Sequence, residues 1–402
     1  MARGGETART QDLALAPVPD RTPDAGPGGS RVRAHLAQWR SVYLAFGISR
    51  LLVLVVGFGS ELVMRLTDAN PANWRPFAFA ETYPHYLDVA TNGYTLQNAF
   101  DYPLLPGVMA AFHTIGIPYA LTAMVLSNVC FLLALIGFAK IGERFVGEGA
   151  ARRAAMYLAF MPFAYWFSVA STESVLLALV VGSTLLALRA TPASWLGAGA
   201  LAAMAAMTRP PGALLGLVLL GIAVSQLRAG TLSKKGIAAA VAAGAMIPAA
   251  IFAFFSYLDQ RTGDFLAAIH AQDQFNRHVS ASGPAKALAS GFENTLGGSP
   301  GQAIELIATL GAAALIVWFA ATATANRWEI RGWTLFGFAS LLLPLATGVL
   351  WQMPRFALLI PPVFWMLGRL TGERRRLHYA ILTLFPLALA VKVATAVIGV
   401  HG

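Results

Sequence analysis

The sequence predicts an all-α, polytopic transmembrane protein. Hydrophobic residues make up 57% of the 402 positions and charged residues only 12%, with a mean hydropathy of +0.61. This composition is too apolar for an ordinary soluble domain. The apolar residues gather in runs of about 20, which is the helix length that crosses the hydrocarbon core of a bilayer.

The charge and cysteine content exclude other classes of protein. The formal charge of +10 comes from basic residues in short clusters between apolar runs, a pattern typical of cytoplasmic loops that face anionic lipid. We therefore expect no nucleic-acid partner. The single cysteine, Cys130, lies inside an apolar run, which excludes a disulfide framework and a cysteine-based metal site.

The N-terminal segment differs in composition from the rest of the chain. Residues 1–38 are rich in Arg, Pro, Gly, Asp and Thr and contain few large apolar side chains. Burial cannot offset the entropy of ordering such a segment, so we expect a disordered cytoplasmic tail. No secretory signal is expected, because the first strong apolar run begins near Val42 and lacks a small-residue cleavage site.

The apolar runs of residues 39–402 predict a single transmembrane domain with about eleven spans. Nine runs are continuous: about 42–64, 119–140, 153–171, 174–190, 236–257, 303–322, 332–350, 355–370 and 377–399. The stretch 194–228 predicts two shorter helices separated at Pro210-Pro211, because proline interrupts one helix and favours the first turn of the next.

Basic clusters predict the orientation of these spans. Placing Arg31, Arg33 and Arg40 in the cytoplasm puts nearly all later basic clusters there too. Two long polar loops, about 65–118 and 258–302, then face outward, provided that 104–118 lies in the interface or re-enters the membrane. The alternative, a full span at 104–118, inverts every later segment and places the basic clusters outside.

Two arginines are expected at outward-facing helix starts. Arg209 precedes Pro210-Pro211, and Arg355 follows Pro354. A cation at a helix N-terminus opposes the helix dipole, so the placement becomes favourable when an anion joins it. Because guanidinium binds phosphate through two hydrogen bonds, we predict that this pair binds a phosphate. The alternative is that both side chains reach toward outer lipid headgroups.

A carboxylate stands at the start of another outward-facing span. Glu173 follows Ser171 and Thr172. A hydroxyl N-cap with an acid in the first turn is one explanation. The other, which capping does not exclude, is that Thr172 and Glu173 orient Arg209 or Arg355.

The first outer loop combines carboxylates with aromatic residues, a combination that suits a sugar site. One carboxylate can act as general base toward an acceptor hydroxyl, and the candidates are Glu81, Asp88 and Asp101. His85 and Tyr86 are expected to bind or orient the substrate. The alternative is an interfacial aromatic belt with ordinary loop acids.

The second outer loop contains polar residues without a metal-binding pattern. Asp264 and Gln272 are expected to bind or orient a substrate. His270 and His278 are too far apart in the sequence to bind one metal from one helical turn, so no metal is expected. Arg50 and Lys392 lie within spans and are further functional candidates, unless they reach the nearer interface.

Five motifs, in order, resemble the PIG-V-type mannosyltransferases of the GT-C class, and in particular their bacterial relatives. They are YLDVATNGY with AFDYPLLP, FMPFAYWFSVASTESVLLAL, MAAMTRPPG, TGDFLAAIHAQDQF and WQMPRFALLIPP. The resemblance implies a GT-C-like fold and inverting transfer of a sugar, mannose in that family, from a polyprenyl-phosphate donor. It further implies a lipid, glycan or protein acceptor on the outer face of the cytoplasmic membrane. No cofactor is implied, because the donor is a co-substrate.

One departure from the family concerns the catalytic acid. The family usually has Trp-Asp where this chain has Glu81 and Thr82. Either Glu81, Asp88 or Asp101 has taken over as base, or the substrate differs, or catalysis is lost. The alternative function is therefore a non-catalytic flippase, transporter or binding protein for polyprenyl-linked sugars.

Overall fold

The computed structural model describes residues 37–67, 76–79, 85–275 and 277–399. Every regular element within these ranges is a helix. The described residues from Ser41 onward form one compact unit. Most of the predicted N-terminal tail, and Glu81 with Thr82, lie outside the described residues.

Within the described ranges, six helical segments are long and apolar enough to cross a membrane, which confirms the predicted all-α transmembrane class. They are α2 (Arg40–Leu66), α5 (Tyr119–Val146), the segment Pro210–Arg228, which comprises α9 (Pro210–Ala213) and α10 (Leu215–Arg228), α11 (Lys234–Thr262), α14 (Pro300–Thr322) and α18 (Arg375–Ile398).

The remaining predicted spans are helices of 10 to 19 residues: α6 (Glu148–Phe160), α7 (Glu173–Ala187), α8 (Pro192–Ala206), α15 (Arg327–Leu345) and α17 (Pro361–Leu370). The count of eleven spans stays a prediction.

Two of the expected spans are interrupted, and proline is the reason in both. The run 153–171 divides after α6, where Met161 is extended before Pro162, and a 3-10 turn η2 (Ala164–Phe167) follows. The run 355–370 divides into α16 (Met353–Ala357) and α17, with Ile360 non-helical before Pro361. The residue before a proline disfavours the α conformation, so neither helix continues through that residue.

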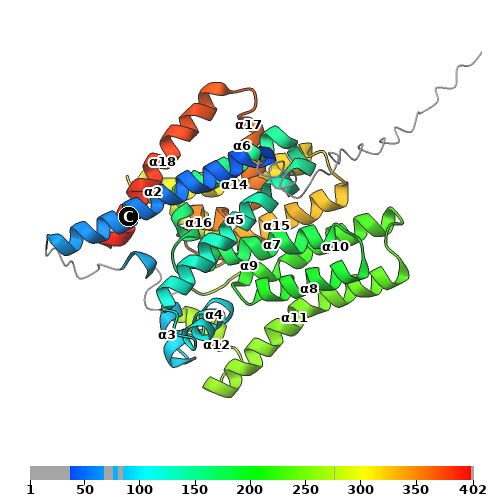
Figure 1. Cartoon of the computed structure of the whole chain (residues 1–402), viewed down its shortest axis with the longest axis horizontal. Coiled ribbons are helices and arrows are strands. Elements are labelled where there is room, and N and C mark those ends of the chain that lie inside the picture. The colour runs from blue at the N-terminus through cyan, green and yellow to red at the C-terminus, as the bar shows by residue number, and fades with distance from the viewer. Residues whose placement is uncertain (1–36, 68–75, 80–84, 276, 400–402) are drawn as a thin grey trace, which may run out of the picture. The chain divides into compact units, whose positions relative to one another are not determined.

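Small residues let the central helices approach closely. A Cβ on Gly199 of α8 would lie 2.5 Å from the Cα of Ala243 in α11. These two helices run side by side in Figure 1. A Cβ on Gly221 of α10 would lie 2.5 Å from the carbonyl oxygen of Trp328 in α15. Such backbone proximity is typical of membrane helix interfaces.

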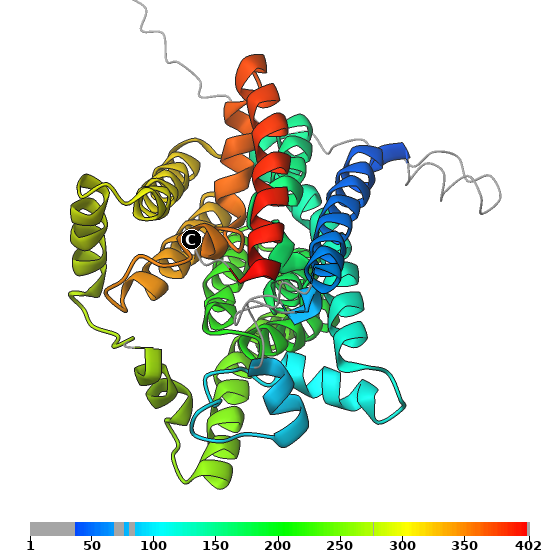
Figure 2. The same ribbon diagram turned by 90° about the vertical axis from the view of Figure 1, so that its left-hand side faces the viewer.

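Both predicted outer loops contain short helices within the described residues. The first contains α3 (His85–Asn92) and α4 (Leu104–His113), and the second contains α12 (Ala267–His270), η3 (Ala271–Phe275) and α13 (Gly283–Leu296). Figures 1 and 2 show α3, α4 and α12 beside the C-terminal end of α11. The ten residues of α4 rise about 15 Å and are too short to cross the core as a helix.

Candidate functional site

A buried ion cluster joins three segments that are distant in the sequence. Glu173, the first residue of α7, is fully buried. Its Oε1 accepts hydrogen bonds from Nη1 of Arg209 and Nε of Arg355, residues 36 and 182 positions away. Its Oε2 accepts from the Ser171 hydroxyl. Two guanidinium cations and one carboxylate leave this cluster with one net positive charge.

Glu173 contacts both arginines, which a helix-capping role alone does not explain. Thr172 is the N-cap residue of α7, and its side chain makes no capping hydrogen bond. Because the carboxylate of Glu173 has no exposed surface, removing either arginine would leave a buried charge with one partner fewer. Of the two explanations for this residue, the structure favours the orientation of Arg209 and Arg355.

Local backbone chemistry explains where the two arginines lie. Arg209 is extended (φ −165°, ψ 157°) before Pro210, as expected of a residue that precedes proline. The following turn folds back on the end of α8, where a Cβ on Gly212 would lie 1.9 Å from the Ala205 carbonyl oxygen. Arg355 lies in α16, directly after Pro354.

Aromatic faces fix the guanidinium planes. The Cζ of Arg355 lies 3.3 Å from the ring centroid of Trp166 in η2, and that of Arg209 lies 5.4 Å from the ring of Phe356. Such contacts stabilise a cation without neutralising it. The indole Nε1 of Trp166 is buried and has no hydrogen-bond partner among the described residues. An unsatisfied donor therefore lies in the ring that packs against Arg355.

Asp101 supplies an unsatisfied acceptor close to the same arginines. The residue is 6% exposed, and its Oδ2 has no hydrogen-bond partner within the described part of the chain. Burial raises the pKa of this carboxyl to about 8, an effect that the positive charge of Arg209 opposes and the negative charge of Asp88 reinforces. A carboxyl with a pKa near the working pH is suited to general base catalysis.

Asp88 is engaged in local hydrogen bonds. Its two carboxylate oxygens accept from the side-chain amides of Asn92 (2.8 Å) and Asn98 (2.7 Å). These hydrogen bonds lower the pKa of Asp88. The carboxylate holds the turn after α3, so of the two described acids in the first loop Asp101 is the better candidate for a base.

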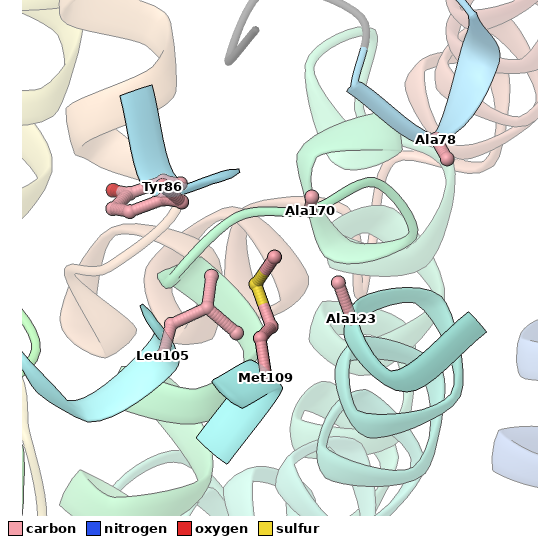
Figure 3. Close-up of a cluster of buried hydrophobic side chains, with 6 residues drawn as sticks. All are labelled: Ala78, Tyr86, Leu105, Met109, Ala123 and Ala170. Atoms are coloured by element: carbon pink, nitrogen blue, oxygen red, sulfur yellow. The ribbon is translucent and has the colours of Figure 1, made fainter. Parts of the chain in front are cut away.

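Tyr86 anchors the first loop beside the ion cluster. Its ring packs in a buried cluster that joins α3, α4, α5 and the segment before α7, shown in Figure 3: Ala78, Leu105, Met109, Ala123 and Ala170. Its hydroxyl lies 3.4 Å from that of Thr172. Burial raises the pKa of Tyr86 to about 12, so it keeps its proton at neutral pH.

The His85 ring packs in an aromatic group. It lies edge-on to Phe100 (5.1 Å between centroids) and Phe275 (6.3 Å). Burial lowers the pKa of His85, so the ring is held in its neutral form.

The predicted residues of the second loop make local contacts only. Asp264 accepts from the backbone N–H of Leu266 (2.9 Å) and pairs with His270 (2.7 Å). The carbonyl of Gln272 accepts from the N–H of Arg277. Neither Asp264 nor Gln272 contacts the Glu173 cluster in the described structure. Among all residues that the structure describes, no three His, Cys, Asp or Glu side chains lie together as metal ligands.

Arg50 is a buried structural arginine. It lies in α2 and donates to the carbonyls of Ala159 (3.0 Å) and Ala164 (2.9 Å) and to the Ser168 hydroxyl (2.8 Å). Backbone groups freed at a helix break inside a membrane need such partners. Arg50 therefore stabilises the non-helical interruption after α6 that contains Trp166. The other intramembrane cation, Lys392, lies 5.2 Å from the ring of Phe163.

Sequence reasoning missed Glu305, which holds the segment of Arg355 in place. From α14, its carboxylate accepts the backbone N–H groups of Gln352 (3.0 Å) and Met353 (2.6 Å). Gln352 has the unusual φ of 55°, and its side chain accepts from Nη1 of Arg355 (2.8 Å). Glu305 is the only charged residue of α14, and an acid within an apolar span was a usable signal.

Replacing Glu305 with Ala is expected to lower the stability of the protein by about 2 kcal/mol or more, because two backbone donors lose their acceptor. Glu305→Gln keeps one acceptor and should lose less. Thermal unfolding in detergent, with the exposed Glu293→Ala on α13 as the matched control, measures the difference. Equal midpoints for Glu305→Ala and the control would contradict this role.

Comparison with known proteins identifies a glycosyltransferase family over part of the chain. Residues 102–255 match the family described as dolichyl-phosphate-mannose-protein mannosyltransferase. This range contains Glu173 and Arg209, begins one residue after Asp101, and ends before Arg355. None of the curated proteins compared with the chain matches it significantly.

Solved structures of low sequence identity were also compared. ArnT from Cupriavidus metallidurans bound to undecaprenyl phosphate gives a TM-score of 0.48 at 14% identity, covering 81% of this chain and 60% of that one. The Archaeoglobus fulgidus oligosaccharyltransferase complex with Zn and sulfate gives 0.45 at 11%, covering 87% and 53%. AglB from the same organism, with an inhibitory peptide and a dolichol-phosphate, gives 0.44 at 12%, covering 89% and 55%.

The chain therefore spans 60% or less of the length of these three proteins. The family match does not reach the narrower PIG-V group, which stays a prediction. Residues 102–255 are similar in sequence to a family of GT-C glycosyltransferases.

Proposed function

We propose that this chain is a membrane glycosyltransferase that transfers a sugar from a polyprenyl-phosphate donor to a hydroxyl acceptor. The family match supports the donor class, because the matched family is described by a dolichyl-phosphate-mannose substrate. The observation that carries the proposal is the buried cluster of Glu173, Arg209 and Arg355 beside the unpartnered carboxylate of Asp101.

The charge of the cluster fits the donor. A phosphodiester carries one negative charge, and Glu173, Arg209 and Arg355 together carry one net positive charge. The N–H groups of Arg209 that Glu173 does not use, together with the unpartnered Nε1 of Trp166, supply donors for phosphate oxygens. The oxygen of Asp101 supplies an acceptor for an incoming hydroxyl.

An apolar groove is formed by residues close in the chain to Asp101 and Arg209, and its lining suits the first isoprenyl units of the donor. Its volume is about 300 Å³, and its lining comes from α4 and the end of α8: Pro103, Leu104, Gly107, Val108, Ala111 and Met207. The Leu104 N–H donates to the Met207 carbonyl (3.0 Å), which joins the two walls. Pro103 and Met207 are each two residues from Asp101 and Arg209, a Cα distance of at most about 7 Å.

The chemistry is a single in-line displacement. The acceptor hydroxyl attacks the anomeric carbon while the bond from that carbon to the phosphate oxygen breaks, and the proton passes to the ionised Asp101. The phosphate leaves as a polyprenyl monoester that carries the second negative charge. Arg209 and Arg355 stabilise this growing charge. One displacement inverts the anomeric configuration.

The remaining features of the proposal come from sequence. Mannose as the sugar follows from the family resemblance. The acceptor class is a glycolipid, lipoglycan or exported protein. The distribution of basic clusters supports a site on the outer face of the cytoplasmic membrane, with a cytoplasmic N-terminus.

A carrier of polyprenyl-linked sugars is the second candidate, because Thr82 stands where the resembling family has its catalytic acid. A measurement of turnover distinguishes the glycosyltransferase from the carrier. Purified protein in lipid nanodiscs is incubated with radiolabelled polyprenyl-phosphate-mannose and membrane lipid, and released polyprenyl phosphate is measured. The proposal expects release by the wild type and none by an Arg209→Ala/Arg355→Ala variant. Donor binding without release would favour the carrier.

A further inference from the structure

A third arginine is held next to the site by the second outer loop. Described residues on both sides of Arg277 contact other parts of the chain. Before it, the side chain of Gln274 donates to the carbonyl of Gln97 in the first loop (2.7 Å). After it, the Ser280 N–H donates to the carbonyl of Ala346 at the end of α15 (2.9 Å). Arg277 therefore lies in an anchored segment.

The contacts of Arg277 lead to Arg355 on one side. Its Cζ lies 4.5 Å from the ring centroid of Trp351. Trp351 directly precedes Gln352, whose side chain accepts a hydrogen bond from Arg355 (2.8 Å). Arg277 and Arg355 therefore contact adjacent residues of one short segment.

On the other side, its contacts lead to Asp101. The Cζ of Arg277 lies 5.5 Å from the ring centroid of Phe275. That ring packs edge-on against Phe100 (5.0 Å between centroids), the residue before Asp101. Arg277 therefore stands between the segment of the phosphate-binding arginine and the segment of the proposed base.

Charge makes this placement unfavourable without an anion. The side chain is half-buried, and both burial and the positive charges of Arg209 and Arg355 lower its pKa. No Asp or Glu among the described residues pairs with it, and the nearby Asp273 pairs with His278 (3.1 Å). Adding Arg277 to the net charge of the Glu173 cluster gives two positive charges, one more than a phosphodiester neutralises.

We propose that Arg277 recognises the second negative charge of the phosphate, the charge present on the released polyprenyl monoester and absent from the phosphodiester donor. This inference rests on the proposed function. A phosphate monoester carries about −1.5 to −2 at neutral pH. The interaction between Arg277 and the phosphate thus becomes stronger as the sugar–oxygen bond breaks. An interaction that is stronger in the transition state than with the bound donor raises kcat more than it lowers KM.

The test compares three ligands in nanodiscs: polyprenyl phosphate, polyprenyl-phosphate-mannose and polyprenyl methyl phosphate. The methyl ester is a singly charged diester without a sugar. Arg277→Gln is expected to weaken binding of the monoester by about tenfold or more and to change binding of both diesters by less than about threefold. Arg261→Gln is the matched control, because Arg261 is exposed and also lies over an aromatic ring, that of Tyr257 (5.5 Å).

The outcomes separate this inference from the proposed function. Equal weakening of all three ligands, or no weakening of the monoester, overturns the role of Arg277 while wild-type binding still supports a phosphate-lipid site. A wild-type protein that binds none of the three ligands contradicts the proposed function itself. Loss of monoester binding in Arg261→Gln as well would show a general charge effect and would also overturn the role.

Discussion

Asp101→Asn is expected to reduce sugar transfer by about 10²–10⁴-fold while donor binding stays near the wild-type level. The amide keeps the shape of the side chain and cannot accept the proton of the acceptor hydroxyl. Because the carboxyl is buried without a partner, the substitution breaks no side-chain hydrogen bond of the described structure. Turnover and donor affinity measured on the same preparation check both parts of the prediction.

Asp88→Asn is the matched comparison for the base. Asp88 lies in the same loop and binds Asn92 and Asn98, so its substitution should affect the order of the loop more than the chemistry. If Asp88→Asn abolished transfer and Asp101→Asn retained it, the assignment of the base would be wrong.

The pH dependence of the wild type provides an independent check. Only the ionised form of Asp101 accepts a proton, and its pKa is raised to about 8. The value of kcat/KM, which reports the free enzyme, should therefore rise with pH and level off above about 8. A profile that already levels off near pH 4–5, the range of an ordinary carboxylate, would exclude Asp101 as the base.

Arg209→Lys is expected to lose most transfer activity, by about 10²–10³-fold. An ammonium group cannot donate to Glu173 and at the same time present a planar pair of donors to a phosphate. The structure shows Arg209 bound to Glu173 through one terminal nitrogen, which leaves the other for a ligand. The measurement is kcat/KM at matched expression, with Arg261→Lys as control. Near-normal turnover of Arg209→Lys would count against phosphate binding by this residue.

Composition and apolar runs were enough to predict the long apolar helices, but not all of their ends and not the short helices within the two polar loops. Pro162 and Pro361 interrupt two predicted spans, and both breaks follow from the rule that the residue before proline avoids the helix. Both prolines lie inside long apolar runs, so apolar composition alone did not reveal the two breaks. The break at Pro162 matters for the site, because it turns Trp166 toward Arg355.

The candidate site was only partly readable from the sequence. Arg209 and Arg355 were predicted to lie on the same side of the membrane, because each is next to a proline at the start of an outward-facing helix. Glu173 was named in advance as a residue that could orient one or the other, but its simultaneous contact with both, one of them 182 positions away, depends on tertiary packing. The preference for Asp101 over Asp88 likewise depends on burial, which the sequence of a polar loop does not reveal.

Arg277 shows the same limit of sequence reasoning. Its aromatic neighbours come from its own segment and from Trp351, 74 positions away, and its charge resembles that of any loop arginine. Only the folded arrangement shows that the cation lacks a described carboxylate partner beside Arg355. Glu305 differs, because its position inside an apolar span could have identified it.

Equilibrium binding of polyprenyl phosphate to the purified protein in nanodiscs tests whether the cluster around Glu173 is a lipid-phosphate site. We expect saturable binding by the wild type and a loss of about 100-fold or more in Arg209→Ala/Arg355→Ala, since each hydrogen bond to a charged group contributes about 1.5–3 kcal/mol. Binding of equal strength in the wild type and the double variant, both folded, would contradict a lipid-phosphate site at this cluster.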